Sequence, residues 1–244
     1  MTLNLQNKDD FVKYFLSPIG SINNSAIVNI GTDGLVSLVS GDDKTIILYA
    51  KYDTSMEVDD NVSLSLPDLG RFVKILQCIE GPGVSLDVED NNISYRSSDM
   101  RFKYHLLEDG ILSQPPISVD KINSLQFDTV FELKRSSFLN LIKSSTFAVN
   151  LNKVYFLTKD GCVFADIDDK QAHNVDSVCI KLCDEFTGAP IVDPLPISFD
   201  TIRRLSTLRS TAVVVSINTK LNVMSFRVNN NGIHMNYIIS GLAK

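Results

Sequence analysis

The chain has 244 residues, of which 44% are hydrophobic and 21% charged, and its formal net charge is −6. This composition excludes an intrinsically disordered chain, which would combine low hydrophobicity with high net charge. No stretch approaches the roughly 18 apolar residues of a membrane span, and residues 1–20 lack the features of a signal peptide. The four cysteines form no Cys-x-x-Cys pair, which indicates a reducing, cytoplasmic compartment.

The predicted elements begin with a helix over 8–16 and strands over 26–30 and 35–39, which Asp33-Gly34 separates as in a hairpin. Strands over 45–52 and 62–66 follow. Leu69, Phe72, Val73 and Leu76 then have the spacing of an amphipathic helix over 68–79, with Asp68 as its cap. The first half ends with strands over 84–88, 93–96 and 101–107.

Residues 109–125 read as an extended connector, because Pro115-Pro116 is incompatible with a helix. It could be an inert linker. Its apolar residues instead favour a segment that covers a surface. In the second half we expect a helix at 135–147 and another at 200–208, with Asp200 in the place of Asp68. Strands are expected over 127–133, 154–157, 162–167, 177–182, 212–218, 223–228 and 233–239.

The two halves repeat one another. Phe11 matches Phe138 and Asp33-Gly34 matches Asp160-Gly161 at an offset of 127 residues, and Leu66 matches Ser198 at an offset of 132. A shared order of matches through both halves indicates a duplicated unit. We therefore predict an α+β fold with two repeated domains, 1–110 and 125–244, joined by a connector at 111–124. Each domain would place two short helices on antiparallel sheet.

Charge is segregated between the helices and the rest of the chain. The predicted helical stretches, counted with the adjoining Lys134 and Arg209, carry a net charge of +6, which leaves −12 for the remainder. A solvated helix face normally mixes both signs. Cations without interleaved aromatic residues suit phosphates better than stacked bases. The basic residues of these helices are Lys8, Lys13, Arg71, Lys74, Lys134, Arg135, Lys143, Arg203, Arg204 and Arg209.

No catalytic or metal-binding constellation is evident. His105, His173 and His234 are isolated, and the paired aspartates at 42–43, 59–60 and 168–169 lie in turn-like contexts. Gly81-Pro82-Gly83 lacks the Lys-Ser/Thr and the helix of a P-loop. We expect a protein that is not an enzyme and needs no cofactor or metal.

Residues 64–76 (LSLPDLGRFVKIL), followed by an acidic β-hairpin that ends at Tyr104, resemble the central part of a DNA sliding clamp subunit. The chain is most similar to the two-domain clamps of tailed bacteriophages and distantly similar to proliferating cell nuclear antigen. The resemblance implies a homotrimeric ring that encircles double-stranded DNA without sequence preference. Such a ring tethers the replicative DNA polymerase, confers processivity in viral DNA replication and is loaded by an ATP-driven clamp loader. A phage-encoded clamp would act in the host cytoplasm, away from membranes.

The resemblance also implies three sets of functional residues. The DNA-binding residues would be Lys13, Arg71, Lys74, Lys134, Arg135, Lys143, Arg203 and Arg204. Partner peptides would contact Ile111, Leu112, Pro115, Ile117, Val119, Ile239 and Leu242. The subunit interface would join two strand edges that contain Arg101, Phe102, Lys103 and Tyr104 on one side and Val178, Cys179 and Ile180 on the other.

Two other classes stay open at this point. A metal-dependent DNA enzyme would need carboxylates that converge in space. A structural phage oligomer of α+β subunits would assemble without encircling DNA.

Overall fold

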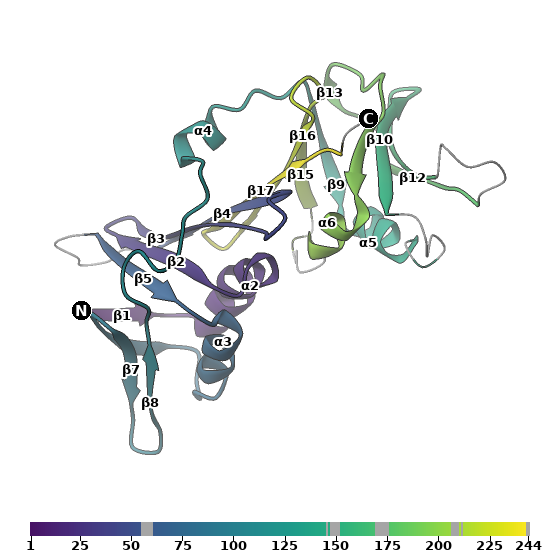
Figure 1. Cartoon of the computed structure of the whole chain (residues 1–244). Coiled ribbons are helices and arrows are strands. Elements are labelled where there is room, and N and C mark those ends of the chain that lie inside the picture. The colour runs from purple at the N-terminus through teal and green to yellow at the C-terminus, as the bar shows by residue number, and fades with distance from the viewer. Residues whose placement is uncertain are drawn as a thin grey trace. The chain divides into compact units, whose positions relative to one another are not determined.

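The computed structural model describes residues 1–54, 61–144, 146, 152–168, 176–205, 210 and 212–242. The chain divides into two compact units (Figure 1). Unit 1 consists of Met1–Asp42, Ile47–Val119 and Asn229–Met235, and unit 2 consists of Asp43–Ile46, Asp120–Val228 and Asn236–Lys244.

Unit 1 contains two groups of antiparallel strands. One sheet has the order β1 (Thr2–Leu5), β6 (Val84–Glu89), β7 (Asn92–Arg96) and β8 (Arg101–His105). The other group runs in the order β4 (Ile46–Asp53), β3 (Gly34–Ser40), β2 (Ala26–Gly31) and β5 (Val62–Leu66). Buried residues alternate with exposed ones along β6 and with half-buried ones along β2, so each sheet turns one face to the core.

The helices of unit 1 form a first segment and a separate α3. α1 (Lys8–Asp10) continues through the π-helix η1 (Phe11–Leu16) into α2 (Ser17–Ile22), and this segment contacts α3 (Leu69–Gln77). α3 buries Leu69, Phe72 and Leu76, which lie on one side of the helix. The helix predicted for 8–16 is therefore confirmed and extends to Ile22.

Side-chain hydrogen bonds hold both ends of α3, from its own N-cap and from two other elements. At its start, Asp68 Oδ1 accepts a hydrogen bond from the Arg71 amide (2.8 Å), as predicted for a cap. The Tyr104 hydroxyl on β8 donates to the Asp68 carbonyl (2.8 Å) and accepts from the Asp68 amide (3.0 Å). Beyond its end, the buried Lys8 ammonium donates to the Ile79 carbonyl.

Unit 2 repeats this plan. One sheet has the order β12 (Val178–Cys183), β11 (Cys162–Ile167), β10 (Lys153–Lys159) and β14 (Leu195–Ser198). The other strands run in the order β13 (Thr187–Gly188), β9 (Thr129–Lys134), β15 (Ala212–Asn218), β16 (Val223–Asn230) and β17 (Ile233–Ser240). Its helices are α4 (Val119–Asn123), α5 (Arg135–Ser144) and α6 (Phe199–Arg204).

The α+β class and the antiparallel pairing are confirmed, and three strands were missed. β1, β13 and β14 were not predicted, and in β14 Pro196 masked the strand pattern. β14 lies at a sheet edge, where a missing amide is tolerated. The internal repeat could have predicted β14, because the offset of 132 residues that matches Leu66 to Ser198 aligns β14 with the predicted strand β5.

The connector and the second pair of helices differ in detail from the prediction. The connector does not stay extended, because α4 begins at Val119 and buries Ile122. α5 ends at Ser144, and residues 145, 147 and 206–208 of the predicted helices lie outside the described residues. Asp200 does not copy the cap of Asp68. The N-cap of α6 is Ser198, and Asp200 lies inside the helix.

The two Asp-Gly turns also differ. Asp160 and Gly161 have φ angles of 52° and 77° between β10 and β11, which confirms a tight turn with both residues left-handed. In the first half the two-residue loop is Thr32 and Asp33, because Gly34 already pairs with Gly31. Gly34 has a φ of 124°, and a Cβ there would lie 2.0 Å from the Tyr52 carbonyl oxygen. Only glycine fits this position.

The substitution Tyr104→Phe should lower the free energy of unfolding by about 1 to 3 kcal/mol, because it leaves the Asp68 amide without its partner, while the Asp68 carbonyl keeps only the bond from the Phe72 amide. Chemical denaturation at fixed protein concentration measures this difference. Tyr95→Phe is the control, since the Tyr95 hydroxyl makes no hydrogen bond within the described residues and its ring still stacks on Phe102 at 5.8 Å. Equal destabilisation of both variants would contradict this role of Tyr104.

Candidate nucleic-acid interface

Unit 1 presents three exposed cations on two helices that pack together. Arg71 and Lys74 lie one turn apart on α3, on the side away from its buried residues. Lys13 lies on η1, with its ammonium 4.5 Å from the centre of the Tyr14 ring. No ion pair ties these three side chains to a carboxylate among the residues that the structure describes. Their charges are therefore available to an anionic ligand.

The carboxylate of Asp68 stabilises the start of the same helix. Its pKa is lowered from the ordinary value, first by the hydrogen bond from the Arg71 amide and then by the hydrogen bond from the Asn24 side chain (3.1 Å). The charges of Arg71 and Lys74 add to this effect. Asp68 thus caps the helix, and its negative charge lies at the positive end of the helix dipole. It forms no ion pair with Arg71 or Lys74 among the described residues.

Unit 2 presents a second set of cations that are partly neutralised. Arg203 on α6 is paired with Asp200, and its guanidinium lies 4.8 Å from the centre of the Phe199 ring. Arg204 Nη2 lies 3.7 Å from Asp43 Oδ2. Burial raises the pKa of Asp43, but hydrogen bonds from Thr45 and the charge of Arg204 outweigh it, so the net pKa is lowered.

The other predicted DNA-binding residues of unit 2 lie on β9 and α5. Lys134 is the last residue of β9 and is exposed. The pKa of Asp184 is lowered mainly by the hydrogen bond and charge of Lys181, and to a lesser degree by the charge of Lys134. Arg135 begins α5 and is half-buried, and Lys143 near its end is exposed. Lys134 and Lys143 thus form no ion pair among the described residues, whereas Arg203 and Arg204 are paired with carboxylates.

Two of the ten basic residues of the predicted helices are not among the eight predicted DNA-binding residues. Lys8 is only 4% exposed and its ammonium is used to hold the carbonyl of Ile79, so it has a structural role. Arg209 lies outside the described residues.

The predicted subunit-interface residues lie on two edge strands. β8 ends the sheet β1-β6-β7-β8, and β12 ends the sheet β12-β11-β10-β14. On β8, Arg101 and Lys103 are exposed and Phe102 is half-buried. Tyr104 requires a correction, because its side chain is buried and bonded to Asp68 and cannot face a neighbouring subunit. On β12 the side chain of Cys179 is exposed, and those of Val178 and Ile180 are half-buried.

The predicted partner residues differ in their exposure. Ile111 is 60% exposed, and Leu112, Pro115, Ile117 and Val119 are half-buried. Ile239 is fully buried in β17, so the expectation that its side chain meets a partner is corrected.

The end of the described chain is bonded into unit 2. Leu242 is half-buried, its amide donates to the Pro196 carbonyl (2.8 Å), and its own carbonyl accepts from Asn222 Nδ2 (3.0 Å). These bonds fix the backbone of Leu242 while leaving part of its side chain accessible.

The aspartate pairs behave as turn residues where they can be followed. Asp43 accepts hydrogen bonds from the amide and the hydroxyl of Thr45. Asp59, Asp60, Asp169 and His173 lie outside the described residues. Among the residues that the structure does describe, no group of three or more His, Cys, Asp or Glu side chains could hold a metal ion. Within the same residues, no helix has the length and apolar character needed to cross a membrane.

Comparison with solved structures identifies the fold. The chain matches a chain of the PCNA2–PCNA3 complex from Sulfolobus tokodaii with a TM-score of 0.77 at 13% identity. The match covers 100% of this chain and 100% of that chain. It matches A. fulgidus PCNA, solved with the C-terminal region of FEN-1, with a TM-score of 0.78 at 14% identity, covering 100% of this chain and 98% of that chain. It matches proliferating cellular nuclear antigen from Entamoeba histolytica with a TM-score of 0.79 at 13% identity, covering 99% of this chain and 98% of the other.

No protein-family model matches the sequence, and no curated protein matches it. At these low identities the likeness establishes the fold. The chain therefore has the fold of the DNA sliding clamps along its whole length, as the resemblance of residues 64–76 implied.

We expect the double substitution Arg71→Ala/Lys74→Ala to weaken binding to duplex DNA. It should also reduce the log–log salt slope by up to about 0.9 for each phosphate that the variant no longer neutralises. Fluorescence anisotropy on a labelled duplex at several salt concentrations measures both effects. The matched control is Lys159→Ala/Lys220→Ala, which removes the same charge from exposed positions off the helices. An unchanged slope in the α3 variant, or an equal change in the control, would contradict the assignment.

Proposed function

We propose that this protein is a sliding clamp that encircles duplex DNA and tethers a replicative DNA polymerase. The observation that carries the proposal is the display of Lys13, Arg71 and Lys74 on the packed helices of a clamp fold. In this proposal the chain has no catalytic activity and no cofactor of its own. Residues 1–110 and 125–244 act as the two clamp domains, and residues 111–124 connect them.

Sliding places a physical requirement on the DNA contacts. A protein that moves along DNA cannot depend on base edges and must use contacts to phosphates that exchange readily. Exposed Lys and Arg side chains on helices meet this requirement, and an acidic remainder disfavours DNA on the other surfaces. We assign the contacts to Lys13, Arg71, Lys74, Lys134, Arg135, Lys143, Arg203 and Arg204, with Arg203 and Arg204 sharing their charge with Asp200 and Asp43.

We propose a homotrimer closed head-to-tail through β8 of one subunit and β12 of the next. Both strands are edges of their sheets, and a ring needs a contact between two different surfaces of the same chain. Arg101, Phe102 and Lys103 would contribute side chains from β8, and Val178, Cys179 and Ile180 from β12. An ATP-driven loader would open and close the ring, as for a clamp of a tailed bacteriophage.

The assembly is tested by its mass in solution. A trimer of the 27.1 kDa chain has a mass of about 81 kDa, three times that of the subunit. Sedimentation or light scattering over a range of concentrations should show this species, and electron microscopy should show a ring. A chain that stays monomeric at high concentration would overturn the proposed assembly.

The topological link to DNA is tested on circles. A loaded clamp should stay on closed circular DNA and leave the same DNA after it is cut, because only the free ends allow escape. Retention that is equal on circular and linear DNA would indicate an ordinary DNA-binding protein. If the protein is retained on neither the circular nor the linear DNA, the alternative of a structural oligomer that does not encircle DNA would be favoured.

Partner binding is assigned to the connector and the C-terminal region. The A. fulgidus PCNA structure contains a C-terminal region of FEN-1, so a clamp fold can bind the terminal segment of another protein. Here Ile111, Leu112, Pro115, Ile117 and Val119 offer apolar side chains that are exposed or half-buried, and Leu242 offers a further one. Such residues suit the apolar anchors of a short peptide.

The substitution Ile117→Asp should abolish stimulation of the polymerase on primed circles while the oligomer and DNA loading persist, because a charge replaces an apolar contact. Val192→Asp is the control, since it places the same charge at an 81% exposed valine outside residues 111–124. Primer-extension length measures the effect. If both variants stimulate like the unchanged protein, the partner contact lies elsewhere.

A further inference from the structure

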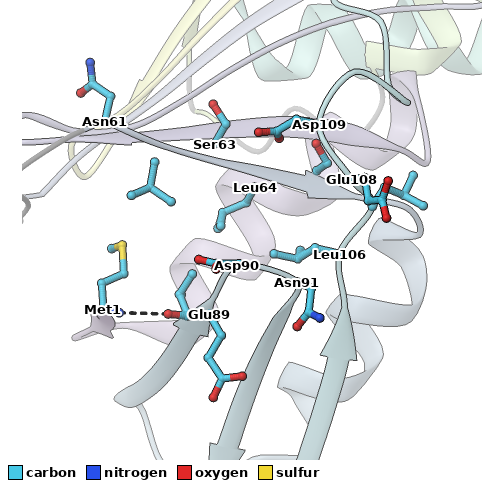
Figure 2. A pocket seen from close by; sticks show the side chains of 14 residues that line it. Met1, Asn61, Ser63, Leu64, Glu89, Asp90, Asn91, Leu106, Glu108 and Asp109 are labelled. Atoms are coloured by element: carbon cyan, nitrogen blue, oxygen red, sulfur yellow. Dashed lines mark hydrogen bonds between the residues drawn. The ribbon is translucent and has the colours of Figure 1, made fainter.

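Unit 1 contains a cavity of about 610 Å³ that the proposed clamp function does not use. It is lined by the edge strand β5, by the turn between β6 and β7, and by the chain that leaves β8. Figure 2 shows Ser63 and Asp109 at the β5 side and Asp90 and Asn91 at the turn. All of its lining residues belong to unit 1.

The β5 side of this cavity is a strand edge with free backbone groups. β5 pairs with β2 on one side only and ends its group of strands. The Ser65 carbonyl points away from β2, because it accepts a hydrogen bond from the Leu107 amide (2.9 Å). In an antiparallel strand, residues two apart direct their backbone groups to the same side. The amide and carbonyl of Ser63 therefore face away from β2 as well, and neither has a backbone partner among the described residues.

The cavity is rich in negative charge and in hydrogen-bond acceptors. No Lys or Arg lines it, but four carboxylates do: those of Glu89, Asp90, Glu108 and Asp109. The amine of Met1 also lines it but already donates to the Val88 carbonyl (2.9 Å), as Figure 2 shows.

Asn92 follows the lining residue Asn91 and lies behind the turn, without lining the cavity itself. Asn92 is fully buried and donates from Nδ2 to Glu89 (2.7 Å) and to Asn91 (2.8 Å). Its Oδ1 has no hydrogen-bond partner among the described residues. The four carboxylates thus give the cavity a net negative charge, which the single amine of Met1 offsets only in part.

The spacing of the carboxylates disfavours a single metal ion. In the part of the chain that the structure describes, no three such side chains converge closely enough to hold one. Distributed negative charge along a strand edge instead matches positive charge distributed along an extended chain. The floor of the cavity includes the buried Leu64, which can pack against an apolar side chain of that chain.

We propose that this cavity binds an extended, lysine- or arginine-rich segment of a partner protein, which adds as a strand to β5. The Ser63 amide and carbonyl pair with its backbone, as in other cases of strand addition. Its basic side chains meet Glu108 and Asp109 near β5 and Glu89 and Asp90 at the turn. The segment binds to unit 1 alone, so the proposal depends neither on DNA nor on ring formation.

The probe for this site is a blocked, fluorescein-labelled peptide of alternating lysine and valine, titrated with the full chain by fluorescence anisotropy. Two peptides control for charge and for backbone pairing. One replaces lysine with glutamate, and the other keeps lysine but carries N-methyl groups on alternate amides. The alternating peptide should bind, and both controls should bind at least about tenfold more weakly, since each lacks one required interaction.

Two pairs of variants locate the site. Glu108→Gln/Asp109→Asn should weaken peptide binding about three- to tenfold, because the variant cannot form these charge pairs. The control Glu80→Gln/Asp99→Asn removes the same charge from exposed positions elsewhere in unit 1 and should bind normally. Ser63→Pro, which removes the free amide, should weaken binding about fivefold or more, whereas Ser63→Ala, which keeps it, should not.

Circular dichroism and thermal melting of every variant check that the fold persists, and the glutamine and asparagine variants keep the test decisive if Ser63→Pro misfolds. Equal binding of the alternating and N-methylated peptides would overturn strand addition. Equal effects of the two charge variants would place the peptide elsewhere. Binding of Ca²⁺ or Mn²⁺ that displaces the peptide and is abolished in Glu108→Gln/Asp109→Asn would identify a cation site instead and overturn the proposal.

Discussion

The placement of α3 depends on the hydrogen bonds between the Tyr104 hydroxyl and the peptide of Asp68. They join the start of the helix to β8, while the Tyr104 ring packs against Phe72 with a 4.9 Å separation of ring centres. Lys8 fixes the other end through the carbonyl of Ile79. With both ends and one face held, α3 presents Arg71 and Lys74 on a rigid support.

This constraint also links two proposed functional regions of unit 1. Tyr104 lies in β8, the strand assigned to the subunit contact, and its side chain points inward to the helix assigned to DNA. Successive side chains of a strand point to opposite faces. The neighbouring Lys103 is therefore exposed while Tyr104 is buried. A single strand can thus support the helix proposed to face DNA with one side chain and offer its backbone edge and its other side chains to the proposed neighbour.

The two units display cations in different electrostatic settings. In unit 1 no ion pair among the described residues ties up Arg71 or Lys74, whereas in unit 2 Arg203 and Arg204 face Asp200 and Asp43. Exposed ion pairs are worth little in water, so DNA phosphates can compete for these arginines. Unit 1 would then contribute more to the salt dependence of DNA binding per cation than α6 does. The carboxylates that line the cavity at β5 of unit 1 would repel DNA. The same negative charge would attract a basic protein segment.

The sequence by itself determined the class of fold, the duplication and the principal helices. Periodic apolar residues specified α3, and Asp68 marked its start, because these signals are local. The repeat of Leu66 at Ser198 even contained the position of β14, which Pro196 concealed from a strand pattern. Residues 64–76 sufficed for the resemblance to clamps, and the full-length structural likeness agrees with it.

Only the tertiary structure decided which side chains remain available. Lys8 and Arg71 look equivalent in a count of charges, yet one is buried against a carbonyl and the other is exposed. Ile239 and Leu242 are both apolar and near the end of the chain, yet only Leu242 keeps accessible surface. The acidic cavity joins residues around positions 63, 90 and 108, whose proximity no local pattern encodes. Burial and strand-edge position arise from contacts between distant segments, and for that reason the sequence alone could not supply them.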